Sequence, residues 1–146
     1  MIKSKEQFDF LLELNNKHKT GPNPGDSIVH YTELRILDPK GYAESPSHGD
    51  KYSRSKALKE RLELTHKILK HWPSDTKKKL DKAAKLTGGR TMREETKEAA
   101  ALYIDEGLSA NMAAKKAGCF VPSVTFAAEK IKIFDEAAKQ YQAMLQ

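Results

Sequence analysis

The stretch Leu108-Ser-Ala-Asn-Met-Ala-Ala-Lys-Lys-Ala-Gly-Cys-Phe-Val-Pro-Ser-Val-Thr-Phe-Ala127 decides the fold of this chain, because it has the pattern of a helix-turn-helix. Ser109 is a good N-cap for a first short helix, and Gly118 is the kind of residue that ends one. Pro122 suits the first turn of a second helix. The pattern therefore predicts two helices joined by a turn of about three residues.

Two short helices that cross steeply need small side chains where they touch. The inward positions predicted here are small or β-branched and uncharged: Ala113, Ala114, Ala117, Cys119, Val124 and Ala127. The outward positions are mostly polar: Asn111, Lys115, Lys116, Thr125 and Glu129. This division suits a helix pair that docks in a DNA groove, and an ordinary Ala-rich helical hairpin is the alternative.

Further matches extend this pattern over residues 88–130, under a third of the chain: Gly88-Gly-Arg-Thr91, Glu98-Ala-Ala-Ala-Leu-Tyr103, Gly107-Leu-Ser109, Ala113-Ala114, Gly118 and Val124. Together they resemble the trihelical, homeodomain-like DNA-binding domain of the resolvase and invertase family, a pattern that also occurs in phage and transposon regulators. Two features depart from that family. The second helix has few Arg, Gln or Asn side chains, and residues 1–87 do not resemble the catalytic domain, so strand exchange is not implied.

Composition narrows the class of protein. A chain of 146 residues fits one domain or a small domain with an appended module. Its single cysteine excludes an intramolecular disulfide. No apolar run approaches the ~18 residues of a membrane span, and no signal peptide is visible. We expect a protein with no membrane association, in the cytoplasm of a bacterial host and associated with the nucleoid.

The formal net charge of +6 is unevenly placed. Residues 51–90 carry 13 basic and 4 acidic side chains, whereas the flanking parts are slightly acidic. A basic block beside a helix-turn-helix favours contact with phosphates, although Lys-rich helices are often only solvated faces.

The first half of the chain predicts a helical body with one small β-hairpin. Ser4-x-x-Gln7 resembles a capping box and opens a helix over residues 4–18, which a loop at 21–25 ends. Residues 28–37 are rich in β-branched and aromatic residues, residues 38–41 form a turn sequence, and Tyr42-Ala43 could return as a partner strand. A second loop follows at 45–49.

The second half predicts three helices ahead of the helix-turn-helix motif. One runs from Ser53 to about His71, the next from a cap at Ser74-Asp75 to Gly88, and a capping box at Thr91-x-x-Glu94 opens a third. The last helix carries an apolar stripe from Val124 to Leu145 that is longer than a trihelical core needs. This stripe either packs back on residues 1–72 or forms a dimer.

DNA-binding roles follow for individual residues. The second helix of the motif would enter the major groove, so the candidates for contact with bases are Ser123, Thr125, Phe126, Glu129 and Lys130. Phe126 could equally be a core aromatic. Arg90 would enter the minor groove, as the corresponding arm does in the resembling family, or else lie in a linker. The candidates for phosphate contact are Lys77, Lys78, Lys79, Arg93, Asn111, Lys115 and Lys116.

Enzyme chemistry has little support in the sequence. The five histidines (His18, His30, His48, His66 and His71) are scattered without metal-ligand spacing. Glu33-x-Arg35 and Asp38-x-Lys40 faintly resemble a nuclease arrangement, but ordinary polar residues are the favoured interpretation. We expect no catalytic residues, no metal and no cofactor.

The sequence therefore predicts a mainly α protein with an N-terminal body over residues 1–87 and a helix-turn-helix domain over residues 88–146. The expected function is sequence-specific binding of double-stranded DNA by a homodimeric transcriptional repressor of phage or mobile-element origin. The alternatives are the small DNA-recognition subunit of a phage packaging terminase and a nuclease-derived, homing-endonuclease-like DNA binder.

Overall fold

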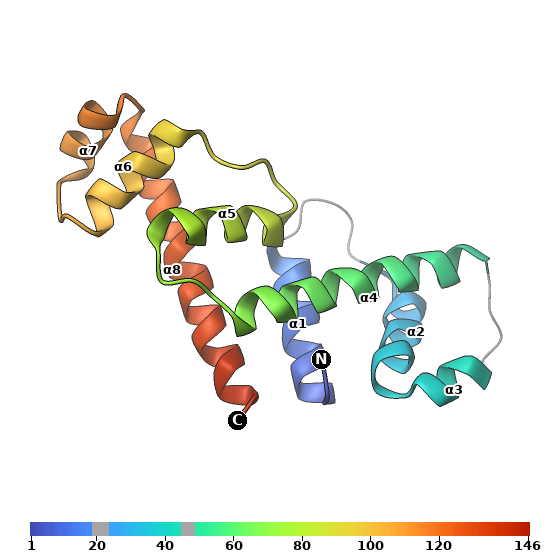
Figure 1. Cartoon of the computed structure of the whole chain (residues 1–146). Coiled ribbons are helices and arrows are strands. Elements are labelled where there is room, and N and C mark those ends of the chain that lie inside the picture. The colour runs from blue at the N-terminus through green and yellow to red at the C-terminus, as the bar shows by residue number, and fades with distance from the viewer. Residues whose placement is uncertain (19–23, 45–48) are drawn as a thin grey trace.

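The computed structural model describes residues 1–18, 24–44 and 49–146. Within these residues the chain forms eight α-helices and no β-strand (Figure 1). Their bounds are α1 Lys5–His18, α2 Asp26–Leu37, α3 Pro39–Glu44, α4 Gly49–Lys70, α5 Thr76–Thr87, α6 Glu94–Ile104, α7 Ala110–Ala117 and α8 Val121–Met144. The mainly α prediction is confirmed. The loops predicted at 21–25 and 45–49 lie largely outside the described residues.

The predicted β-hairpin is wrong, because its two segments are the helices α2 and α3. Ile28 and Thr32 recur at helical spacing on the buried face of α2, and the Thr32 hydroxyl donates to the Ile28 carbonyl oxygen at 2.7 Å. This face packs along α4, and that tertiary burial outweighs a β-propensity that depends strongly on context. Asp38 and Pro39 start α3, since the Asp38 carboxylate accepts from the Gly41 N–H at 3.0 Å.

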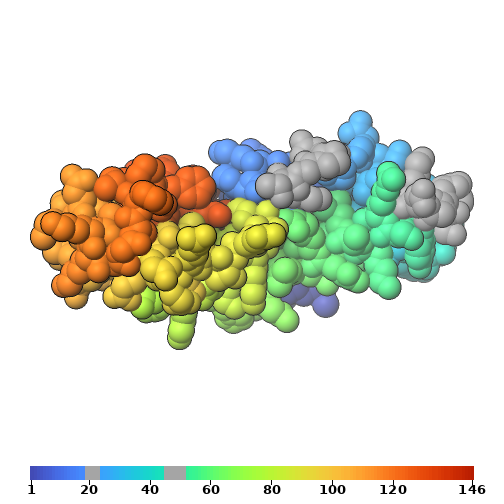
Figure 2. Space-filling view, turned by 90° about the horizontal axis from the view of Figure 1, so that it is seen from above, coloured from blue at the N-terminus to red at the C-terminus, as the bar shows by residue number. Residues whose placement is uncertain are grey.

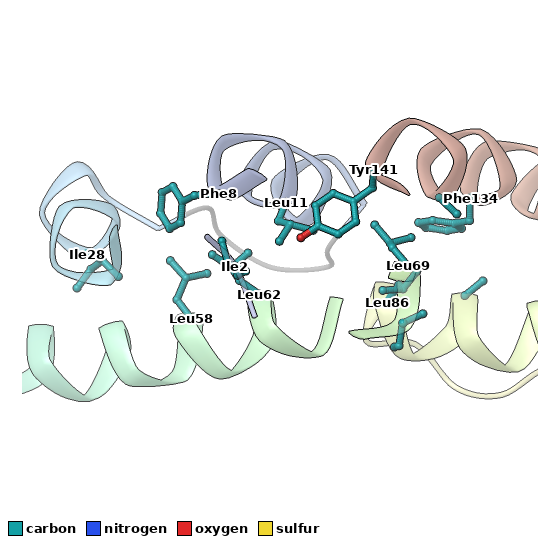
Figure 3. Packing of buried hydrophobic residues seen from close by; sticks show 13 residues of the cluster. Ile2, Phe8, Leu11, Ile28, Leu58, Leu62, Leu69, Leu86, Phe134 and Tyr141 are labelled. Atoms are coloured by element: carbon teal, nitrogen blue, oxygen red, sulfur yellow. The ribbon is translucent and has the colours of Figure 1, made fainter. Parts of the chain in front are cut away.

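A core of large side chains joins α1, α2, α4, α5 and the C-terminal half of α8 (Figure 3). Phe8 and Leu11 of α1 and Leu62 and Leu69 of α4 are fully buried in it. Phe134 and Tyr141 of α8, near the C-terminus, are buried in the same core. In Figure 3 the Phe134 ring lies beside Leu69 and the Tyr141 ring lies beside Leu11. We call α1 to α5 with the α8 segment 131–144 the body.

Helix α8 shows which of the two predicted roles its apolar stripe has. Val124, Ala127, Ile131, Phe134, Ala138 and Tyr141 are all buried. The helix packs against α1, α4 and α5 as well as against α6 and α7. The stripe thus packs back on the N-terminal helices, and one continuous helix connects the two parts of the molecule (Figure 1).

Helices α6 and α7 and the α8 segment 121–130 form what we call the three-helix unit, in which each helix packs on the other two. The predicted caps of α7 are confirmed: the Ser109 hydroxyl accepts from the Met112 N–H at 3.2 Å, and Gly118 ends the helix with φ +82°. Gly tolerates this left-handed conformation without steric cost. The capping box predicted at Thr91 is wrong, because α6 begins only at Glu94, after Arg93.

The core of the three-helix unit is made of small side chains, as expected. Ala99, Leu102, Ala113, Ala114 and Val124 are buried together, and Ala117 and Cys119 are half-buried against them. A second small cluster of Leu80, Ala100, Ala127 and Ile131 joins α5, α6 and α8 across the predicted boundary at residues 87 and 88.

Seen from above, the molecule is elongated, with the three-helix unit at one end and α2 and α3 at the other (Figure 2). None of the helices in residues 1–18, 24–44 and 49–146 combines the length and apolarity that a membrane crossing needs.

Candidate nucleic-acid interface

The outer face of α8, opposite its buried stripe, carries three of the predicted base-contacting residues. Thr125, Phe126 and Glu129 are exposed, and the Phe126 side chain is 63% exposed. The structure therefore decides between the two interpretations of Phe126, which is a surface aromatic and not part of the core.

The Thr125 hydroxyl is used inside the helix. Its Oγ1 donates to the Pro122 carbonyl oxygen at 3.1 Å and lies 3.5 Å from that of Val121. Such back-bonding to the preceding turn is common for Ser and Thr in helices. It uses the one donor of the side chain, so the γ-methyl group and the acceptor lone pairs of the oxygen remain for an external partner.

Ser123 and Lys130 lie on the flank of this face and are both half-buried. The Lys130 Nζ atom lies 5.7 Å from the centroid of the Phe126 ring, within the range of a cation–π contact. Burial lowers the pKa of the Lys130 ammonium from its ordinary value. Lys130 thus supports the Phe126 ring from one side.

A shallow groove of about 520 Å³ joins the start of α8 to the segment that precedes α6. Its lining residues are Thr91, Met92, Arg93, Thr96, Pro122, Ser123 and Phe126. The fold thereby brings a predicted phosphate contact, Arg93, beside two predicted base contacts that lie about thirty residues later in the chain. Arg90 is exposed in the same connecting segment.

Four predicted DNA-contacting residues at this end of the molecule carry exposed cationic side chains. Arg90, Arg93, Lys115 and Lys116 are exposed, and the structure shows no ion pair for any of them among the described residues. Asn111 is exposed on the same short helix as the two lysines. In addition, the segment 107–128 contains no Asp or Glu. An anion approaching α7 and the start of α8 therefore meets cations that no carboxylate of this segment offsets.

The lysines of α5 are in a different situation. Lys77 pairs with Glu98 of α6, and this hydrogen bond raises the pKa of Lys77. Lys79 pairs with Asp135 of α8 at 3.0 Å, whereas Lys78 is exposed and outside these pairs. Exposed ion pairs contribute little stability, but they offset the positive charge locally.

Sequence reasoning missed two exposed apolar side chains of this end. Phe120 is 82% exposed at the N-cap of α8, and Met112 is 59% exposed on α7. The sequence does contain an indication for Phe120. A large apolar residue is a poor N-cap, so a phenylalanine between Gly118 and Pro122 indicates a role other than capping.

The residues that resembled a nuclease arrangement have structural roles. Glu33 pairs with Lys5 at 2.9 Å, and Asp38 caps α3. The Arg35 guanidinium lies over the Tyr42 and Tyr52 rings, 4.3 Å and 4.2 Å from their centroids. In the part of the chain that the structure describes, no three His, Cys, Asp or Glu side chains are grouped so that they could hold a metal ion.

Comparison of the chain with protein-family models, with curated proteins and with solved structures found no match.

Proposed function

We propose that this chain is a sequence-specific binder of double-stranded DNA that acts as a dimeric transcriptional repressor. The observation that carries the proposal is the carboxylate-free segment 107–128, with its exposed face on α8 and exposed, unpaired cations on α7 and before α6. Sequence-independent affinity for DNA comes from cations on phosphates, and specificity comes from side chains at the base edges. This end of the molecule offers both kinds of group.

The binding mode follows from the positions of these groups. The first turns of α8 would lie in the major groove, which is about 12 Å wide and admits a helix. Lys115, Lys116 and Arg93 would hold phosphates on either side. Arg90 would reach the adjacent minor groove, where the negative potential attracts arginine.

The body would hold the recognition helix in place. Because α8 continues into the large core through Phe134 and Tyr141, its N-terminal turns have a fixed direction relative to the rest of the molecule. A site built on a rigid element positions its side chains more accurately than one built on a loop.

We propose a homodimer because one short helix makes few base contacts. Each good contact contributes only about 1–3 kcal/mol of discrimination. Two half-sites on a two-fold symmetric dimer are the usual way to reach useful specificity. Bound across a promoter, such a dimer would block polymerase. The resemblance noted in the sequence is the basis for proposing an origin in a phage or mobile element and a location in the bacterial nucleoid.

The test is selection of bound sequences from a random duplex DNA library at about 0.15 M salt, a physiological ionic strength, without metal ions. The mass of the recovered complex is measured by light scattering. We expect an enriched inverted repeat with two chains bound. No retention of duplex DNA would overturn the proposal, and a ring of many chains on DNA would replace the repressor with a packaging role.

A matched pair of variants keeps a folding defect apart from a binding defect. Lys115→Ala/Lys116→Ala removes two cations at the proposed interface, and Lys40→Ala/Lys56→Ala removes two exposed cations from α3 and α4. The first variant should lose on the order of tenfold in affinity and the second little, since two phosphate contacts contribute a salt-dependent term. Equal losses would contradict the assignment of the interface.

A further inference from the structure

The first turns of α8 offer an exposed surface that is unusual for a base-contacting helix. Its outward positions are the Pro122 ring, the Thr125 side chain and the Phe126 ring, and all three are exposed. Phe120 continues this surface at the N-cap. Hydrogen-bonding side chains that read guanine or adenine, such as Arg, Gln and Asn, are absent from residues 120–128.

The hydroxyl proton of Thr125 on this surface is already engaged. Because the Thr125 hydroxyl donates to the Pro122 carbonyl oxygen at 3.1 Å, turning it outward would break a hydrogen bond of the free protein. The Ser123 hydroxyl lies on the flank, in the groove with Arg93, and Glu129 lies a full turn beyond Thr125. Between residues 120 and 126 the outer face therefore presents mainly carbon atoms, together with the Thr125 oxygen as an acceptor.

Base edges in the major groove carry one apolar group, the 5-methyl group of thymine. We propose that the outer face of α8 recognises the 5-methyl groups of neighbouring thymines, with Phe126 and the Thr125 γ-methyl group as the specificity-determining contacts. This inference rests on the proposed function, and it names the chemical group that the same surface takes.

Charge favours DNA as the occupant of this apolar surface. Arg93 lines the groove of about 520 Å³ together with Phe126, and Lys115 and Lys116 are exposed in the last turn of α7, the helix that precedes α8. A protein partner that buried only the apolar part would leave these cations paired with water alone. A duplex supplies phosphates for the cations and methyl groups for Phe126 and Thr125 in one surface.

The test uses two random duplex libraries with the same base pairs, one synthesised with thymine and one with uracil, which lacks only the 5-methyl group. Selection with the wild-type chain should enrich a thymine-containing motif from the first library. The thymines of that motif are then replaced by uracil one at a time. Each replacement at a contacted position should weaken binding about fourfold, which is the effect of burying one methyl group.

Two variants of one residue distinguish a methyl contact from a hydroxyl contact. Thr125→Val keeps the methyl group and loses the hydroxyl, whereas Thr125→Ser keeps the hydroxyl and loses the methyl group. Thr125→Val should bind the selected duplex like the wild type, and Thr125→Ser should lose about fourfold on the thymine duplex and less on the uracil duplex.

The outcomes separate this inference from the function on which it rests. Equal enrichment of one sequence from both libraries, with Thr125→Ser equal to the wild type, would overturn methyl recognition and leave DNA binding in place. Failure to retain either library would overturn the proposed function and this inference with it.

Discussion

The body and the three-helix unit are built from different side chains and use their charges differently. The body buries large residues such as Phe8, Phe134 and Tyr141, and the lysines of its α5 reach carboxylates of α6 and α8. The three-helix unit buries mostly alanines and leaves large apolar side chains and cations at its surface. In the proposed function the body thus supplies stability and direction, and the three-helix unit offers the surface for DNA.

The largest expected effect lies in the body. Phe134→Ala removes a buried ring that packs beside Trp72 and His18, and it should lower the free energy of unfolding by about 3–5 kcal/mol. Val124→Ala, in the core of the unit, removes about two methylene equivalents and should cost about 2 kcal/mol. Urea unfolding of both variants tests this, and a larger loss for Val124→Ala would reverse the comparison.

Lowering the pH should destabilise the body before the three-helix unit, because burial lowers the pKa of two of its histidines, His18 and His66. His66 is buried and hydrogen-bonded to the Tyr141 hydroxyl, and burial lowers its pKa from 6.5 to about 4. As the pH falls, the unfolded chain therefore takes up this proton before the folded chain does.

The free energy of unfolding should accordingly fall as the pH drops from about 6.5 towards 4, with no contribution from this group above that window. Urea unfolding at a series of pH values measures the slope. His66→Gln should reduce this slope, and what remains should include the contribution of His18, whose pKa burial also lowers. A slope that is unchanged in His66→Gln would contradict the role given to His66.

The smallest of these effects lies at the turn of the three-helix unit. Gly118 has φ +82° with open space around its Cα, so Gly118→Ala meets no clash and should cost about 1–2 kcal/mol through backbone strain alone. Gly89→Ala is the control, because Gly89 lies outside the left-handed region and an added methyl group there makes only ordinary contact. Equal stabilities of the two variants would contradict a strained turn.

Local patterns predicted the three-helix unit well. The caps Ser109 and Gly118 and the small inward residues are decided by neighbours within a few positions, so the sequence carries the information. The N-cap Asp75 and the end at Gly88 of α5 are predictable for the same reason, since the Asp75 carboxylate accepts from the Lys78 N–H at 3.0 Å.

Tertiary contacts account for the errors. Residues 28–37 are helical because Ile28 and Thr32 are buried against α4, which β-propensity does not reveal. Helix α6 starts at Glu94 because Met92 packs against the cluster around Leu80, which holds the preceding residues outside the helix.

The candidate site was predictable in part. Thr125, Glu129, Lys115 and Lys116 have the exposure that the helical pattern predicts. The pairing of Lys79 with Asp135, 56 residues away, depends on how α5 packs on α8, so a count of charges along the chain could not anticipate it. The exposure of Phe120 likewise depends on where α8 begins.

The most direct test of the account compares the two sets of cations on the same duplex DNA. The slope of log K against log salt is measured for the wild type, for Lys115→Ala/Lys116→Ala and for Lys77→Ala/Lys79→Ala. The account predicts that the first double variant reduces the slope by about 2, at about 0.9 for each lost phosphate contact, and that the second changes it little. A slope reduced by the α5 variant and unchanged by the α7 variant would contradict the account.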